Sequence, residues 1–267
     1  MELLSTSRRL TRYVLCLVVL AVFFADAGAV KTVTIIAEDD WYPYSSQVKG
    51  VSQGFAVDVV RAAYAAVDVE VNFKFASFKS CLTQVEAGTE VGCFDITLDE
   101  DTQSRFLFPN EPLFVDTGGI YAIDKPGLAD RVTPQDLVGS RVGFTNGAVY
   151  GDFLDKAKGI QREYAMSDLS NLRKLVAGRQ DYSLVSTVIA NYIFKSHATD
   201  FTVMPKLVGV VSNQKMYVGF SKKRPESKEA AALLDAGLVK IRANGTYKKI
   251  EAQWLGNTPL PDKHRAQ

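Results

Sequence analysis

Two groups of adjacent carboxylates are the residues whose types and spacing suit chemistry best. One is Asp39 and Asp40, and the other is the run Asp99-Glu100-Asp101. Paired acids can exchange protons with a substrate or bind calcium. Acidic side chains also favour the first turn of a solvated helix, where they lie near the positive end of the helix dipole. We expect the second group to be such a helix start, so the sequence predicts no catalytic pair.

The histidines offer no metal site. His264 lies in the last segment, residues 257–267, which contains prolines and basic residues and is expected to be disordered. His197 alone cannot build a zinc site of the usual composition. The sequence also contains no P-loop and no H-E-x-x-H motif. We therefore expect no catalytic residues, no metal and no other cofactor.

The N-terminal residues have the three parts of a secretory signal peptide. Arg8, Arg9 and Arg12 precede an uncharged apolar run, residues 13–25. This run is shorter than the roughly 20 apolar residues that span a bilayer. Small residues then follow with the A-x-A spacing of a cleavage site. We expect residues 1–29 to be removed on export, and the alternative is an N-terminal anchor helix that stays uncut.

The charge of the remaining chain is balanced. Residues 1–29 hold three of the 31 basic and two of the 30 acidic residues, so 28 of each remain after cleavage. A net charge near zero disfavours nucleic acid or an anionic membrane surface as a partner. The apolar content of 47% is ordinary for a packed globular protein.

Hydrophobic spacing predicts an α/β unit in the first half of the chain. Residues 33–37 form a β-branched apolar run typical of a buried strand, and a helical pattern follows Gly54. Residues 69–75 alternate as a strand, and residues 78–87 form a second helix that we expect to end at Gly88. Strand, helix, strand and helix in this order predict a parallel sheet covered by helices.

The same order restarts after a turn signal at residues 124–127. Strands are expected at residues 141–144, 184–185 and 216–220, and helices at 171–177, 231–241 and 247–254. Two α/β units joined by short linkers predict two lobes with a cleft between them. Small ligands favour such interdomain clefts.

Six short motifs, in this order and spacing, resemble the family 3 bacterial extracellular solute-binding proteins, the receptors of amino-acid ABC importers. They are Asp40-Trp41-Tyr42-Pro43-Tyr44, Gln53-Gly54-Phe55-Ala56-Val57-Asp58, Arg105-Phe106-Leu107-Phe108-Pro109-Asn110-Glu111-Pro112, Leu137-Val138-Gly139-Ser140-Arg141-Val142-Gly143, Ala177-Gly178-Arg179-Gln180-Asp181-Tyr182, and Ala243-Asn244-Gly245-Thr246-Tyr247 with Gln253-Trp254.

The resemblance implies the two-lobed periplasmic binding protein fold of type II, with two parallel-sheet lobes joined by two crossover strands. It places these strands near residues 119–123 and 216–220. Lobe 1 would then begin with residues 30–121, and lobe 2 would span residues 122–215. Residues 216–256 would form the return crossover and C-terminal helices packing on lobe 1, and ligand binding would close the lobes about this hinge.

The resemblance also implies where a ligand would bind. Trp41 falls at the family's aromatic that stacks on the ligand, and Phe78 falls where many members place a second aromatic of the cleft. Core packing is the alternative role for both rings. Asp95 and Thr97, on the strand that follows the second helix, complete this side of the expected site as an acid and a hydroxyl.

Three polar positions depart from the family's pattern. Thr102 stands where members that bind α-amino acids have the arginine that grips the carboxylate, and Arg105 lies three residues further on. Ser186 replaces the aspartate that binds the ligand ammonium. Ala148 falls within the segment that reads Gly-Thr-Thr in the family. An ordinary amino acid is therefore disfavoured as a tight ligand, and an uncharged, hydroxylated or cationic molecule is favoured.

Two cysteines remain outside the signal segment, Cys81 on the second expected helix and Cys93 on the strand that follows. An even pair in an oxidising compartment permits a disulfide. Two buried free thiols are the alternative, because the resemblance places both cysteines near core positions.

These features together predict a monomeric periplasmic protein that captures a small polar molecule, an amino acid or a related solute, for an inner-membrane ABC importer. The alternative is a sensor of the same fold that reports its ligand to a membrane receptor. An enzyme on this fold is less favoured, because no acid–base pair stands out beyond acids expected at a helix start.

Overall fold

The computed structural model describes residues 31–146, 148 and 150–256. The chain divides into two units, Met1–Lys31 and Thr32–Gln267, and the second contains the fold reported below. The expected signal peptide, residues 1–29, and the expected disordered tail, residues 257–267, lie outside the described residues. Within the described ranges, no helix is both long enough and apolar enough to span a membrane.

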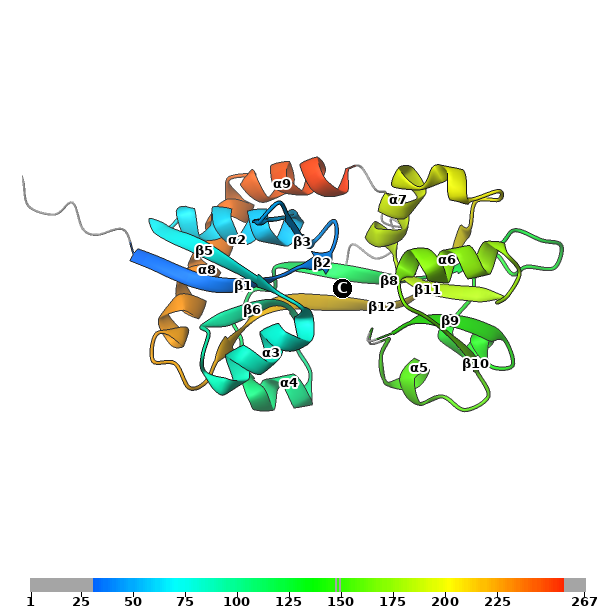
Figure 1. Ribbon diagram of the computed structural model, residues 1–267, viewed down its shortest axis with the longest axis horizontal. Helices are drawn as coiled ribbons and strands as arrows, with labels where there is room; N and C mark the ends of the chain where they lie inside the picture. Colours follow the sequence, from blue (N-terminus) through cyan, green and yellow to red (C-terminus); the bar gives the residue numbers. More distant parts are fainter. Residues whose placement is uncertain (1–30, 147, 149, 257–267) are drawn as a thin grey trace, which may run out of the picture. The chain divides into compact units, whose positions relative to one another are not determined.

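One large sheet organises the described part of the chain (Figure 1). Its strands follow the order β10-β9-β11-β8-β12-β6-β1-β5, and β7 pairs with β12. Their bounds are β1 Lys31–Glu38, β5 Val69–Ala76, β6 Gly92–Thr97, β7 Phe106–Leu107, β8 Phe114–Ala122, β9 Arg141–Thr145, β10 Gln161–Ala165, β11 Tyr182–Ser186 and β12 Lys206–Ser221. A second, small sheet contains β2 Asp40–Trp41, β3 Ser45–Val48 and β4 Val51–Gln53.

The helices in the described ranges are α2 Phe55–Ala65, α3 Phe78–Ala87, α4 Glu100–Arg105, α5 Asp152–Lys156, α6 Asp168–Val176, α7 Thr187–Ser196, α8 Ser227–Ala243 and α9 Thr246–Leu255, with 3₁₀ turns η2 Pro134–Leu137 and η3 Ala198–Asp200. Helices α2, α3, α6, α8 and α9 fall where the apolar spacing predicts helices, although α6 begins three residues before the predicted start at residue 171. The spacing missed α5 and α7. The predicted end of α3 is confirmed, because Gly88 caps it in the left-handed conformation, with φ of 83°. The acidic run that begins at Asp99 is a helix start, as expected, with Asp99 as the N-cap of α4.

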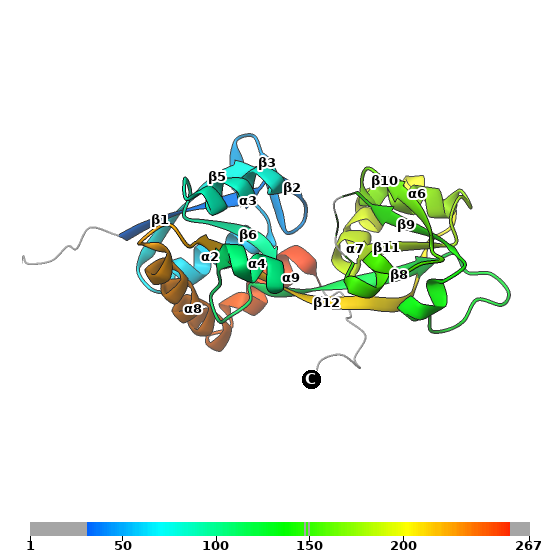
Figure 2. The same cartoon turned by 90° about the horizontal axis from the view of Figure 1, so that it is seen from below.

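The strands β8 and β12 connect the two halves of the large sheet (Figures 1 and 2). They pair antiparallel from Ala122 opposite Lys206 to Phe114 opposite Met216. On one side β12 pairs with β6, and on the other side β8 pairs with β11. The two strands therefore link the half of the sheet that contains β1 and β6 to the half that contains β9 and β11.

The predicted strand at residues 216–220 is correct in place but too short. The structure extends β12 back to Lys206, and most of residues 206–215 are half-buried or exposed. Two register shifts also interrupt the pairing of this part with β8. Backbone hydrogen bonds to β8 hold residues 206–215 in place. Because this part does not bury alternate side chains, its apolar spacing gives only a weak strand signal.

Three apolar cores form around this sheet. The largest contains the inward faces of α2 and α8, together with β1, β6 and residues of α6 and α7. The second surrounds β9 and includes Val142, Phe144 and Leu184. Helices α2 and α8 approach closely at Gly237, where a Cβ atom would overlap the backbone of Ala63. The apolar side of β5 is covered only in part, because Phe75 is 48% exposed.

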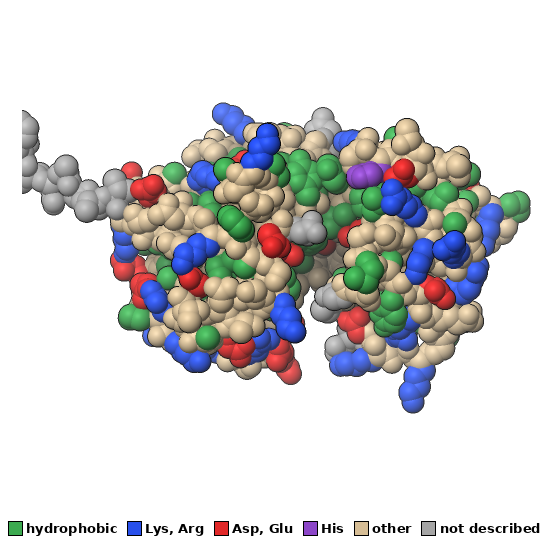
Figure 3. Space-filling view, in the orientation of Figure 1, with side chains coloured by type: hydrophobic (Ala, Val, Ile, Leu, Met, Phe, Trp, Pro, Cys, Tyr) green, Lys and Arg blue, Asp and Glu red, His purple; other side chains and the backbone are tan. Residues whose placement is uncertain are grey.

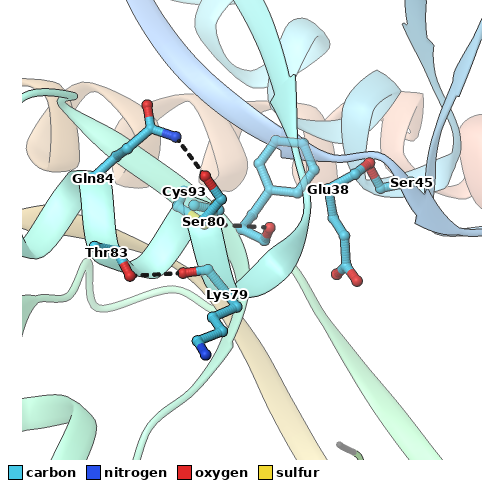
Figure 4. The surroundings of a disulfide bond; sticks show 9 residues. Glu38, Ser45, Lys79, Ser80, Thr83, Gln84 and Cys93 are labelled. Atoms are coloured by element: carbon cyan, nitrogen blue, oxygen red, sulfur yellow. Dashed lines mark hydrogen bonds between the residues drawn. A yellow bond between two sulfur atoms is a disulfide. The ribbon is translucent and has the colours of Figure 1, made fainter.

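The third core encloses a disulfide that joins α3 to β6 (Figure 4). Cys81 and Cys93 are bonded with their Cα atoms 5.9 Å apart. Both side chains are fully buried, and Ile36, Val85 and Phe106 belong to the same cluster. Figure 4 also shows Glu38, at the end of β1, extending its carboxylate away from the labelled Cys93. The covalent bond thus anchors α3 to the start of β6.

We predict that this disulfide stabilises the folded protein by about 3 kcal/mol, the value that the chain-entropy model gives for so short a loop. The two cysteines are 12 residues apart in the sequence. Urea unfolding with and without a reductant measures the difference. The Cys81→Ser, Cys93→Ser double variant is the control, and the reductant should leave its unfolding curve unchanged. Thiol titration that finds both cysteines free in the unreduced, denatured protein would contradict the prediction.

Candidate functional site

The carboxylate of Asp116 connects three parts of the fold. Asp116 lies on β8, and its Oδ1 accepts hydrogen bonds from Tyr44 Oη at 2.7 Å and from Ser186 Oγ at 2.6 Å. Tyr44 precedes β3, and Ser186 is the N-cap of α7 at the end of β11. Burial raises the pKa of Asp116, and the hydrogen bonds from Ser186 and Tyr44 oppose that rise. The contact joins the segment between β2 and β3 to strand β8 and to the end of β11.

Asp95 on β6 is a buried acid without a hydrogen-bond partner. Its side chain is 5% exposed, and both carboxylate oxygens lack a partner. Burial raises the pKa of Asp95 well above its ordinary value, and the charges of Glu38 and Asp116 raise it further. Strand β1 runs parallel to β6 with Ile36 opposite Cys93, so both Glu38 and Asp95 lie two residues beyond this pair. The ends of two neighbouring strands therefore bring these acids together.

A fourth acid lies on the other half of the sheet. Asp168 is the first residue of α6, and its Oδ1 accepts a hydrogen bond of 2.5 Å from Thr145 Oγ1 at the end of β9. Burial raises the pKa of Asp168, the bond from Thr145 lowers it, and the charge of Asp116 raises it again. Among the described residues, no lysine or arginine forms an ion pair with Asp95, Asp116 or Asp168. An ionised carboxylate at any of these three positions therefore has no basic side chain among the described residues to compensate its charge.

Aromatic rings flank the acids on the first half of the sheet. Tyr44 stacks on Phe114 with ring centroids 4.5 Å apart, and Trp41 lies 4.5 Å from Tyr44. Tyr44 is fully buried, whereas Trp41 is half-buried and keeps part of its ring accessible. In the space-filling view the surface is hollowed near β8 and β12, with apolar and acidic side chains at its border (Figure 3). The packing of Trp41 on the cluster leaves an accessible aromatic surface.

The side chains of Thr102 and Arg105 both already have partners in α4 or in the segments next to it. The hydroxyl of Thr102 completes a capping box with Asp99 and donates a hydrogen bond of 2.8 Å to the Thr97 carbonyl. The guanidinium of Arg105 forms ion pairs with Glu86 at 2.6 Å and with Asp101 at 3.1 Å. Arg105 therefore already has carboxylate partners from its own surroundings.

The other residues named from the sequence lie in different surroundings. Phe78 begins α3 and is partly buried against the cluster around the disulfide. Ala148 is exposed in the loop after β9, and Thr97, the last residue of β6, is half-buried. Ser186 lies at the centre of the arrangement through its bond to Asp116. The structure thus brings Trp41 and Ser186 together through contacts with Tyr44 and Asp116, and the charge of Asp116 also acts on Asp95.

Sequence reasoning missed Asp116, Tyr44 and Asp168 as site residues. The missed signal for Asp116 is its charge within β8, whose other residues are apolar or small apart from Thr117. Tyr44 belongs to the aromatic-proline-aromatic motif, but nothing in that motif predicts its bond to a distant carboxylate. Asp168 resembles any acid in the first turn of a helix, and only the fold places it beside Thr145.

The run Gly50-Val51-Ser52-Gln53-Gly54 matches the G-x-S-x-G pattern of serine hydrolases, a match that the sequence reasoning also missed. In those enzymes the serine lies on a sharp turn with a base in contact. Here Ser52 is the middle residue of β4 and pairs with Gln47, and its buried Oγ has no hydrogen-bond partner. This serine therefore has no base in contact to activate it.

Comparison with known proteins agrees with this architecture. The profile of the bacterial extracellular solute-binding proteins, family 3, matches residues 33–257, and the chain belongs to this family. The putative ABC transporter arginine-binding protein 2 of Escherichia coli (strain K12) is 26% identical over 261 residues, which cover 91% of this chain and 98% of the relative.

Two solved structures are similar to this chain in fold. One is the probable amino-acid ABC transporter extracellular-binding protein ytmK from Bacillus subtilis, with a TM-score of 0.72, 20% identity, and coverage of 86% of this chain and 100% of that chain. The other is a histidine kinase sensor domain similar to periplasmic binding proteins, with a TM-score of 0.69, 21% identity, and coverage of 84% and 96%. The expected two-lobed fold of type II is confirmed.

We predict that Asp95→Asn makes the ligand-free protein more stable relative to the wild type as the pH rises. The raised pKa of Asp95 means that the unfolded chain ionises this carboxyl first, at a pH of about 4. Its contribution to stability is full below that pH and is lost as the pH rises through the folded-state pKa. The asparagine stays neutral, so the difference in Tm between variant and wild type should increase as the pH rises above about 4.

Thermal unfolding at a series of pH values measures this difference. Asp130→Asn is the control, because Asp130 is exposed and the same chemical change there removes no buried charge. A Tm difference for Asp95→Asn that stays constant over the whole pH series would show that Asp95 carries no unfavourable buried charge.

Proposed function

We propose that this protein captures a small solute between its two lobes and delivers it to an inner-membrane ABC importer. The observation that carries the proposal is the Asp116 carboxylate, which binds Tyr44 of one lobe and Ser186 of the other at the connecting strands. Family membership supports solute capture, and the ABC-transporter relative from Escherichia coli supports the importer. The sensor alternative rests on a shared fold, which does not distinguish the two roles.

In this proposal the protein acts in the periplasm as a monomer, after residues 1–29 have been removed. Lobe 1 comprises residues 30–121, lobe 2 comprises residues 122–215, and residues 216–256 return to lobe 1. The protein is a binding protein and not an enzyme. The run of acids supports this, since Asp99 caps α4 and Glu100 and Asp101 lie in its first turn.

The half-buried Trp41 forms an aromatic wall of the site, and Asp95, Thr97 and Ser186 supply its polar groups. Phe78, the first residue of α3, forms a second aromatic wall in this proposal. The positions of Thr102, Arg105 and Ala148 leave an amino-acid carboxylate without its usual partners. Removing one partner of a buried ion pair costs about 3–5 kcal/mol. Each 1.4 kcal/mol is about tenfold in affinity, so a micromolar site for an α-amino acid weakens to about millimolar.

A thermal-shift screen tests the capture of a solute. The panel contains the twenty common amino acids, amines, guanidines, sugars and small carboxylic acids. At least one non-amino-acid solute should raise Tm, and the rise should grow with the logarithm of its concentration, because a ligand that binds only the folded state stabilises it by mass action. A panel without any such rise would contradict solute capture.

Calorimetry against the twenty amino acids then tests the lost anchors. We expect no dissociation constant in the low-micromolar range for any of them. Low-micromolar binding of one unmodified α-amino acid would contradict the proposed ligand class while supporting solute capture.

A further inference from the structure

We propose that Asp95 is the anchor for a positively charged nitrogen of the ligand, and that the ligand is an amine or guanidine without an α-carboxylate. This inference rests on the function proposed above, and it names the ligand class of the same site.

The first step is the state of Asp95. Its side chain is 5% exposed, and neither carboxylate oxygen has a hydrogen-bond partner. A buried polar group without a partner is unfavourable, and a buried unpaired charge is more so. Asp116 contrasts with it, since Tyr44 and Ser186 both donate to its Oδ1. Of these two buried acids, Asp95 is the one whose carboxylate oxygens still lack a hydrogen-bond donor.

The second step is the charge of the group that would pair with Asp95. Glu38 and Asp116 both act on Asp95 with negative charge, and Asp95 in turn acts on Tyr44. A neutral hydroxyl would satisfy one oxygen of Asp95 without opposing the effect of the Glu38 and Asp116 charges on it. A cation would satisfy hydrogen bonds and charge together. The described residues contain no group of three or more His, Cys, Asp and Glu side chains arranged to hold a metal ion, so the geometry favours an organic cation.

The third step is the absence of a place for a carboxylate. The guanidinium of Arg105 is bound by Glu86 and Asp101, and the hydroxyl of Thr102 caps α4. A ligand carboxylate near Asp95 and Asp116 would be close to two other acids. Neither Arg105 nor Thr102 would be available to bind it, because both already have partners. A cation without a carboxylate avoids this repulsion, and the accessible part of the Trp41 ring can face its charge.

The pH dependence of binding follows from the same contacts. Glu38 of β1, Asp116 of β8 and the Tyr44 hydroxyl are the titratable groups that act on Asp95. Burial and the two carboxylates raise the pKa of Asp95, and a bound cation favours the ionised carboxylate and lowers that pKa. Binding of the cation should therefore release protons to the buffer in the pH range between the two values.

Calorimetry with two matched probes tests the proposal. Agmatine carries a guanidinium and an ammonium group, and L-arginine adds the α-carboxylate to the same skeleton. We expect agmatine or 1,4-diaminobutane to bind at least tenfold more tightly than L-arginine. Asp95→Asn should weaken the amine at least tenfold, and Asp130→Asn, at an exposed acid, should leave its affinity unchanged.

A second measurement needs no variant. The binding enthalpy of the wild-type protein is measured in buffers of different ionisation enthalpy, and its slope gives the number of protons released. A release that is detectable near neutral pH or below supports the role of Asp95. An enthalpy independent of the buffer at every pH tested would overturn it, as would an unchanged amine affinity in folded Asp95→Asn.

The outcomes separate this inference from the function on which it rests. If sugars or carboxylic acids bind and the amines do not, solute capture stands and the cation site is wrong. If no solute in the panel binds, both proposals fail. Tighter binding of L-arginine than of agmatine would show that the site holds a carboxylate, which contradicts the inference alone.

Discussion

The antiparallel pairing of β8 with β12 is the interaction on which the rest of the structure depends. It runs from Ala122 opposite Lys206 to Phe114 opposite Met216, and each half of the sheet is hydrogen-bonded to one of its two edges. A two-stranded connection resists sliding through its ladder of hydrogen bonds but permits bending and twist. It therefore fixes the register in which the two halves of the sheet are joined. A hinge that bends in this way is what the proposed capture of a solute requires.

The acids near this connection follow from the same arrangement. Asp116 lies on β8 itself, and Asp95 lies on β6, which pairs with β12. Burying carboxylates beside one another opposes folding, because each loses water and meets like charge. The apolar cores and the Cys81–Cys93 bond supply stability elsewhere in the fold. In this account the buried carboxyl of Asp95 is retained because a cationic ligand supplies the partner that it lacks in the free protein.

Much of the fold was predictable from the sequence, because its signals are local. The apolar spacing predicts α3 to begin at Phe78, and Gly88 ends it through a conformation that glycine adopts easily. The acids of α4 indicate a helix start through the dipole and the cap. The first half of β12 escaped prediction because its stability comes from pairing with a distant strand and not from the burial of alternate side chains.

The candidate site was predictable only in part, for a similar reason. Trp41 was named from a motif and Ser186 from its position in the family resemblance. The roles of Asp116 and Tyr44 depend on a contact between residues 72 positions apart in the sequence. Burial decides the role of Asp95, and a sequence does not record whether an acid has a partner. Long-range contacts of this kind become visible only when the strands are placed side by side.

The titration of the Asp95 carboxyl carbon, followed by carbon-13 NMR with and without a bound amine, tests the central claim most directly. Comparison with Asp95→Asn assigns the signal. The account predicts a pKa above the ordinary value of about 4 in the free protein, and a lower pKa in the complex. A pKa near 4 in the free protein, unchanged when the amine binds, would contradict it.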